Sequence, residues 1–414
     1  MCLNRPSLAY PVLRPLALAS VVTFALGLAG CAPQTVAVKP PVQQAPVVAV
    51  TPAVTAPSRP APPPQNLVNT GGKTDVALLL PLSGPTAPLG RDMLDAAQMS
   101  LIELGADDMV LTPKDTRGTA EGAAAAARLA IAEGAKLIVG PLTAPEAEAV
   151  KPIAQAAHIN VLAFSSIASI AGNGLYLMGI LPREELTRIA SYARSTGVDH
   201  FAALVPNNAY GQLVADEFAR AVAAAGGTLD DSETYEPGGS DLKSVVKHLS
   251  ANGKFTFTAL LVPETGTKLK NTVAQLGLVD INQQKVKLLG TGIWDMPDLG
   301  SEPSLIGGRY AAPPPDARAG FQDRFRQAYG HAPQRLATLA YDAVGVAAVL
   351  DRTPGADFSA AALANPNGYA GADGIFRFRA DGTAERGLAV LQVEHAGTSI
   401  VSPAPDSFEN APSQ

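Results

Sequence analysis

The strongest constraint on the fold is a regular alternation of short apolar runs and alanine-rich stretches that begins at Thr74. The run "DVALLLP" is typical of a buried strand, and residues 86–104 then carry apolar side chains at helical spacing. The series continues with "MVLTPKD", the helical stretch "GTAEGAAAAARLAIAEG", "KLIVG", a helix at 144–157 and "NVLAF". Because helices follow strands in regular order, the pattern predicts a parallel sheet covered by helices on both faces.

A second series of the same kind starts after "GLYLMGILP". Its expected strands are "HFAALVP", "TLDDSETY", "FTALLVP" and "KVKLLGTG", and its expected helices are 183–195, 209–225, 241–251 and 265–276. Two complete series predict an α/β protein of two lobes, each a parallel sheet flanked by helices.

The remaining segment is too short for a third domain and is expected to complete both lobes. It carries helices at 316–330 and 334–351 and a hairpin-like pair in "GIFRFRADGTAERGLAVLQVEH". The chain would therefore cross between the lobes. The expected boundaries are 74–181 plus about 311–377 for the first lobe, 182–310 plus about 378–402 for the second, and a flexible tail at 403–414.

The first 30 residues have the layout of an export signal. Arg5 and Arg14 precede a largely apolar stretch at 16–29, which is too short to cross a bilayer comfortably. The stretch ends in "LAGC", which resembles the bacterial lipobox, so we expect Cys31 to be diacylated. The alternative is a plain secretory signal with a chance cysteine. Since Cys2 lies in the discarded segment, no disulfide and no cysteine-based metal site or nucleophile is expected.

Residues 31–73 are predicted to be a lipid-anchored linker. Positions 32–73 hold ten prolines among Gln, Val, Ala and Thr, and this composition favours extended polyproline II geometry. At ~3.1 Å per residue such a segment could reach on the order of 130 Å. The formal net charge of −6 becomes more negative once the two arginines of the export signal are removed. An acidic exported chain without a basic run is not expected to bind nucleic acid, or to reach a membrane other than through its lipid.

Five segments in colinear order resemble the type I periplasmic-binding proteins, in particular the leucine/isoleucine/valine receptors. They are "PLSGPTAPLGRDMLDAAQMS", "IVGPLT", "VLAFSS", "NNAYGQLVADEF" and "GIFRFRADGTAERG". The resemblance implies a ligand site between the lobes, at the carboxyl ends of parallel strands, where backbone N–H groups and helix dipoles suit a carboxylate. The residues expected there are hydroxyl-bearing: Ser83, Thr143, Ser165, Ser166 and Tyr210.

Each of these residues has a structural alternative. Thr143 has capping-box spacing to Glu146, and Ser83 precedes a Gly-Pro turn. The two serines of "AFSS" could cap the following short segment, and Tyr210 could be a packing ring. Trp294 could lie at the rim of the cleft or in a core.

The resemblance also predicts a departure from the amino-acid receptors. In those proteins a carboxylate of the second lobe binds the ammonium group of the ligand, and the matching position here is Gly239. Glu236 or Glu264 could substitute, and position 167, often a hydroxyl residue in the receptors, is Ile167. An ammonium without a partner would be costly to bury, so the acidic half of the site is expected to be missing.

The lipobox, the proline-rich linker and the "LAFSS" loop resemble a second branch, the LppC-type penicillin-binding protein activators. This resemblance implies a lipoprotein on the periplasmic face of the outer membrane, because Ala32 differs from the aspartate that marks inner-membrane retention. Its partner would be a peptidoglycan synthase. Those activators carry a helical-repeat domain where this chain has the linker. The alternative is a periplasmic solute receptor of an ABC importer for amino acids or amides.

An enzyme is not expected. The sequence has no GxSxG, P-loop, GxGxxG or HExxH pattern, and its five histidines lack metal-ligand spacing. We therefore predict no catalytic residue, no metal and no cofactor.

Overall fold

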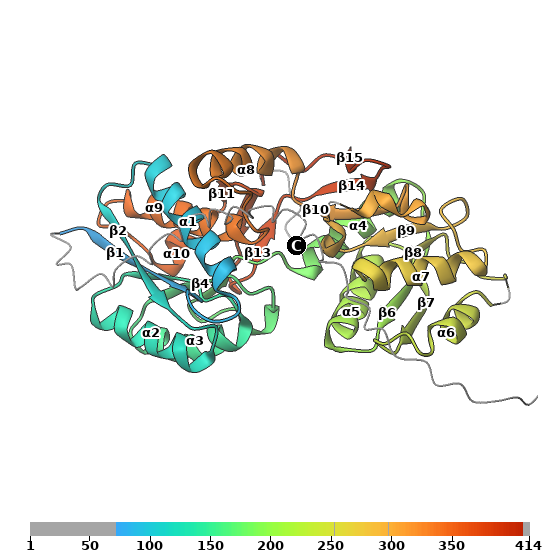
Figure 1. Ribbon diagram of the computed structural model, residues 1–414, viewed down its shortest axis with the longest axis horizontal. Helices are drawn as coiled ribbons and strands as arrows, with labels where there is room; N and C mark the ends of the chain where they lie inside the picture. Colours follow the sequence, from blue (N-terminus) through green and yellow to red (C-terminus); the bar gives the residue numbers. More distant parts are fainter. Residues whose placement is uncertain (1–71, 252, 297, 409–414) are drawn as a thin grey trace, which may run out of the picture. The chain divides into compact units, whose positions relative to one another are not determined.

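The computed structural model describes residues 72–408, except for residues 252 and 297. Within these residues the chain forms two mainly parallel sheets with helices on both faces, and a small antiparallel sheet (Figure 1). The predicted export signal, Cys31 and the linker up to residue 71 lie outside the described residues. None of the helices in the described part of the chain combines the length and apolarity needed to cross a membrane.

The first sheet has five parallel strands in the order β2-β1-β3-β4-β5. Its strands are β1 (Thr74–Leu80), β2 (Met109–Asp115), β3 (Leu137–Val139), β4 (Asn160–Ala163) and β5 (Leu175–Leu177). Its helices are α1 (Ala87–Glu103), α2 (Ala120–Ala132), α3 (Ala144–Ala156) and α9 (Ala337–Asp351). Strand β1 is buried on both sides: Leu78 and Leu80 pack toward α1 and α9, and Ala77 and Leu79 toward α2 and α3.

The second sheet has seven strands in the order β15-β14-β10-β9-β8-β6-β7. Its strands are β6 (His200–Pro206), β7 (Thr228–Tyr235), β8 (Ala259–Leu261), β9 (Lys287–Gly290), β10 (Arg309–Ala312), β14 (Ala389–Val393) and β15 (Thr398–Ser402). Strands β14 and β15 are antiparallel to the others. Its helices are α4 (Pro182–Ser195), α5 (Ala209–Ala224), α6 (Leu242–Leu249) and α7 (Gly266–Leu278). Helices α4 and α5 cover one face, and α6 and α7 the other.

The small sheet completes the first lobe. It consists of β11 (Tyr369–Gly371), β12 (Gly374–Phe378) and β13 (Ala384–Arg386), and it is preceded by α8 (Pro315–Tyr329) and α10 (Ala360–Leu363). Phe376 and Phe378 pack in the same cluster as the strands of the first sheet. The chain therefore passes between the lobes after β5, after β10 and after β13.

The predicted fold class is confirmed, and the strands and helices expected from periodicity are present with ends shifted by a few residues. The lobe boundaries differ from the expectation. Strand β10 reaches Ala312 in the second sheet, and the hairpin β12–β13 lies with the first lobe through Arg386. The expected crossing near residue 378 was therefore too early: Phe378 and Ala384 pack in the core of the first lobe. Only β14, the second half of the hairpin-like segment, joins the second sheet.

The described part of the predicted flexible tail, residues 403–408, contacts the second lobe and the small sheet. The Nη2 of Arg188 donates to the carbonyl of Pro403 at 3.0 Å. The side chain of Phe408 is buried, and the Arg377 guanidinium lies 4.6 Å from the centre of its ring. Residues 403–408 therefore pack against the body of the protein.

Phe376 offers a test of the join between the small sheet and the first lobe. Its ring is fully buried, contacts Tyr369 and Phe378, and lies 4.8 Å from the guanidinium carbon of Arg386. We expect Phe376→Ala to lower the free energy of unfolding by about 3–5 kcal/mol in urea titrations, because a large cavity forms beside a buried charge. Ile102→Ala, at a side chain 76% exposed on α1, should change it by less than about 0.5 kcal/mol. Equal effects of the two substitutions would contradict this packing.

Candidate functional site

A cavity of about 650 Å³ lies where the two lobes meet. The first lobe contributes the loops after β3 and β4 and the residues that lead into α9. The second lobe contributes the first turn of α4 and the short 3-10 helix Gly292–Trp294 after β9. The walls are mostly apolar and include Leu142, Phe164, Ile167, Ile180, Ile293 and Leu339. Polar groups at the carboxyl ends of parallel strands complete them, as is usual for ligand sites in open α/β sheets.

Three of the predicted hydroxyl residues line this cavity: Thr143, Ser165 and Ser166. Thr143 also forms the predicted capping box, because its N–H and its Oγ1 both donate to Glu146 Oε2, at 2.9 and 2.7 Å. The Ser165 side chain accepts a hydrogen bond from the Ile167 N–H at 3.1 Å, which closes the turn after β4. The two roles coexist, since each side chain serves local structure and still borders the cavity.

The other two predicted hydroxyl residues do not line the cavity. Ser83 donates to Asp115 Oδ2 at 2.6 Å and so ties the loop after β1 to the end of β2. The Tyr210 hydroxyl lies 2.9 Å from Thr291 Oγ1, and burial raises its pKa to about 12. Trp294 is fully buried in the second lobe and donates to the Val262 carbonyl, so it is a core residue and not a rim residue.

The second lobe has no carboxylate at the predicted matching position, but it places two acidic side chains elsewhere on the cavity wall. Gly239 has a φ of 72° in a loop that borders a different, smaller pocket. Glu264 is buried and accepts a hydrogen bond from the Tyr235 hydroxyl at 2.5 Å, so it is not the substitute either. The acidic groups of the cavity are Glu185 and Asp295, which lie elsewhere in the second lobe.

Glu185 is a carboxyl group held against the cavity by a close backbone approach. Its Oε2 accepts a hydrogen bond from the Gly292 N–H at 2.8 Å. A Cβ at position 292 would lie 2.2 Å from Oε1, so a larger residue there would displace the Glu185 carboxyl group from this position. Burial raises the pKa of Glu185 to about 8, although the Gly292 hydrogen bond and the charge of Arg335 act in the opposite direction. The group is therefore mainly protonated at neutral pH and has an O–H to donate.

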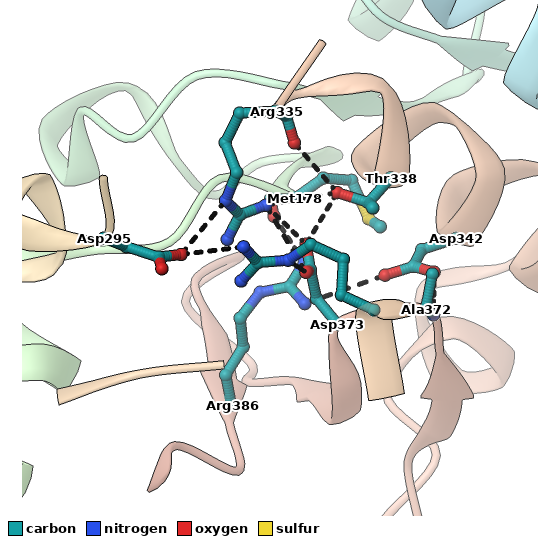
Figure 2. A network of polar contacts seen from close by, with 9 residues as sticks. Met178, Asp295, Arg335, Thr338, Asp342, Ala372, Asp373 and Arg386 are labelled. Atoms are coloured by element: carbon teal, nitrogen blue, oxygen red, sulfur yellow. Dashed lines mark hydrogen bonds and ion pairs between the residues drawn. The ribbon is translucent and has the colours of Figure 1, made fainter. Parts of the chain in front are cut away.

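Asp295 is paired with arginines of the first lobe (Figure 2). The Nη1 of Arg318 lies 2.8 Å from Asp295 Oδ2, and the Nε of Arg335 lies 3.4 Å from the same oxygen. Both arginines also contact Asp373, Arg318 at 3.1 Å and Arg335 at 3.0 Å. Two arginines and two aspartates thus form a charge-balanced group that joins the lobes beside the cavity.

Asp373 is the buried centre of this group. Its side chain is fully buried, and Thr338 Oγ1 donates to Oδ2 at 2.6 Å. Burial alone would raise the pKa of Asp373, but Arg335 and Arg318 hold it below its usual value. Asp373 is therefore ionised and fixes the position of both arginines.

A second buried pair, Arg386 and Asp342, lies near the Asp373 group (Figure 2). Arg386 Nη1 lies 3.8 Å from Asp342 Oδ2, and its Nη2 donates to the Met178 carbonyl at 2.6 Å. Asp342 accepts a hydrogen bond from the Ala372 N–H at 2.6 Å, and burial raises its pKa to about 7. Since Met178 follows β5 and begins the first crossing of the chain, this pair links that crossing to β13.

The arrangement is suited to binding. Apolar walls, three hydroxyl residues, one guanidinium and one protonated carboxyl surround a volume that fits a small molecule. In the described part of the chain, no group of three or more His, Cys, Asp or Glu side chains is placed to hold a metal ion. Glu185, Asp295 and Arg335 were missed from the sequence because no local pattern marks them: they come from a helix start, a loop and the residues before α9.

A family model described as periplasmic binding protein matches residues 73–398 of this sequence. The chain belongs to the periplasmic binding protein family. The match covers both lobes and all three crossings between them, so the family assignment applies to the whole described body.

Solved structures show the same fold. A putative branched-chain amino acid ABC transporter protein from Rhodospirillum rubrum has a TM-score of 0.71 and 19% identity, with 80% of this chain and 100% of that chain covered. A substrate-binding protein from Streptococcus pneumoniae, in complex with isoleucine, has a TM-score of 0.57, 18% identity and coverage of 80% and 100%. A solute-binding protein from R. palustris, in complex with 4-hydroxybenzoate, has a TM-score of 0.61, 18% identity and coverage of 81% and 98%.

One curated relative, an uncharacterized protein from Rickettsia prowazekii, is 26% identical over 178 residues. This match covers 43% of this chain and 47% of that protein, so the chain spans about half the length of the curated relative.

The raised pKa of Glu185 leads to a pH-dependent stability. The folded state keeps a proton between the usual pKa of 4.5 and about 8, whereas the unfolded state has lost it. The free energy of unfolding should therefore fall, by up to about 1.4 kcal/mol per pH unit, as the pH rises through this window. We expect Glu185→Gln to remove this contribution. In urea titrations, the free energy of unfolding of the variant should therefore rise relative to that of the wild type between pH 5 and about 8. Asp342 titrates in both proteins and cancels from the difference. Parallel stability curves would contradict a protonated Glu185.

Proposed function

We propose that this protein is the solute-binding component of an ABC importer, and that it captures a small molecule with a carboxylate and an apolar body. The observation that carries the proposal is the cavity between the lobes, with apolar walls and a few polar groups from both sides. Its volume of about 650 Å³ is in the usual range for small-molecule sites. A ligand in contact with both lobes stabilises one arrangement of them, and that arrangement is what a permease can recognise.

The ligand class has support from the chemistry of the cavity and from similar proteins. The cavity offers one guanidinium and hydroxyl donors for a carboxylate, and aliphatic and aromatic side chains for an apolar body. The two complexes named above hold isoleucine and 4-hydroxybenzoate, which share these two features. The membership in the periplasmic binding protein family supports a location in the periplasm.

The hypothesis of a penicillin-binding protein activator has less support. Two of the features behind it, the lipobox and the linker, fall on residues outside the described part of the chain. The missing carboxylate at Gly239 also favoured it, but two other acidic side chains of the second lobe, Glu185 and Asp295, border the cavity. Activation of a synthase therefore stays a prediction, and the same holds for attachment to the outer membrane.

Ligand capture can be measured by calorimetry on the full-length chain, unfolded and refolded to remove any bound molecule. We expect saturable binding of at least one of isoleucine, leucine, benzoate and 4-hydroxybenzoate. Ser166→Trp should abolish this binding, because a large ring from an exposed position on the wall would fill the cavity.

Ser232→Trp, at an exposed position on the edge strand β7, is the matched control and should bind as the wild type does. If none of the four compounds binds, while the protein retains a bifunctional peptidoglycan synthase in a pull-down and stimulates it, the importer proposal fails and the activator hypothesis replaces it.

Lipid attachment is tested separately. We expect Cys31→Ala to move the protein from the membrane fraction to the soluble periplasmic fraction, because the thiol that would carry the acyl chains is absent. Cys2→Ala is the control and should leave the protein with the membranes. A membrane fraction unchanged by Cys31→Ala would refute the lipobox.

A further inference from the structure

We propose that Arg335 is the residue that binds the carboxylate of the ligand, and that it gives up its contact with Asp295 to do so. This inference rests on the proposed function, because it assigns one end of the ligand to one residue of the same cavity. Arg318 would keep Asp295 paired during the exchange.

The two arginines differ in access to the cavity although they share the same acidic partners. The Arg335 side chain is 33% exposed and lines the cavity, whereas the Arg318 side chain is 11% exposed and does not line it. Arg335 is therefore the guanidinium that a ligand can reach.

The contacts of Arg335 leave half of its guanidinium free for a ligand. Its Nη1 is fixed by Asp373 at 3.0 Å and lies 3.4 Å from Thr338 Oγ1. Its Nε makes only a long contact of 3.4 Å with Asp295, and among the described residues no partner of Nη2 is found. The buried Asp373 thus orients the group, and one edge of the fork remains for a carboxylate, which guanidinium binds through two parallel hydrogen bonds.

Release of Asp295 by Arg335 leaves no unpaired buried charge. Asp295 Oδ2 is closer to Arg318 Nη1, at 2.8 Å, than to Arg335 Nε, at 3.4 Å. The contact of Asp295 with Arg318, the shorter of the two, is kept during the exchange. The desolvation penalty that usually accompanies the breaking of a buried ion pair is therefore largely avoided.

The surroundings of Arg335 favour a monocarboxylate. Leu336 and Leu339, which follow Arg335 in the chain, present apolar surface beside it. Glu185 is mainly protonated at neutral pH, so it does not repel an anion, and its O–H can donate to a second polar group of the ligand. A carboxylate should therefore be preferred over the corresponding amide, which cannot form a charge-assisted pair.

The test compares each acid with its amide in calorimetric titrations of the full-length chain: isoleucine with isoleucinamide, benzoate with benzamide, and 4-hydroxybenzoate with 4-hydroxybenzamide. For the acid that binds the wild type, we expect Arg335→Gln to lower the affinity about 10- to 100-fold, the range for a lost charge-assisted hydrogen bond. The affinity for the amide should not change. Arg324→Gln is the matched control. It removes an arginine of α8 that pairs with Glu103 and does not line the cavity, so the variant should bind as the wild type does.

A second substitution tests the exchange itself. We expect Asp295→Asn to raise the affinity for the acid, because Arg335 loses its competing partner, and this gain should vanish in the double variant with Arg335→Gln. Loss of the Asp295 charge would by itself favour an anion, so a purely structural role of the arginine predicts the same gain with and without Arg335, and the double variant decides.

The inference is overturned if the wild type binds an acid and Arg335→Gln keeps the preference for acid over amide, and the proposed function then stands. It is also overturned if the gain in Asp295→Asn persists without Arg335. If the wild type binds none of the three acids, the proposed function fails first and the inference falls with it.

Discussion

The buried carboxylate of Asp373 is the interaction on which the junction of the two lobes depends. It orients Arg318 and Arg335, and these two side chains reach Asp295 in the second lobe. Loss of one partner from such a buried group typically costs about 3–5 kcal/mol, because the remaining charge has no water to solvate it. The position of the cavity wall at Arg335 is therefore set by a residue of the short turn between β11 and β12, which does not itself line the cavity.

Close backbone approaches allow these polar groups to be packed together. A Cβ at position 371 would lie 2.5 Å from the carboxylate of Asp342, and one at position 179 would lie 2.5 Å from the Ser165 carbonyl. With the contact of Gly292 and Glu185, two glycines of the cavity wall and one near the buried Arg386–Asp342 pair admit oxygen atoms at distances that a Cβ would not allow. The local shape of the site is thus fixed by residues that contribute no functional group of their own.

Periodicity was sufficient to predict the fold because strands buried on both faces and amphipathic helices leave strong patterns over many residues, as in "DVALLLP" and in α1. The site was predicted only in part. Thr143, Ser165 and Ser166 lie in the loops after β3 and β4, so the topology of the sheet places them at the cavity. Glu185, Asp295 and Arg335 reach the cavity only because of how the lobes meet, and their burial cannot be predicted from a local stretch of sequence. Ser83 and Tyr210 have suitable chemistry, but their hydroxyls are held by Asp115 and Thr291 instead.

The crossings of the chain have a consequence for how the protein folds. The core of the first lobe combines Val76 from β1 with Val344 from α9 and Phe376 from β12, and that of the second combines Leu204 with Leu391. Neither core can close before almost the whole chain is present, and contacts between segments so distant in sequence make folding slow. Truncation before β14 would leave β10 as an unpaired edge of the second sheet, which is a template for aggregation. Both cores are therefore complete only once the last strands of the chain are available.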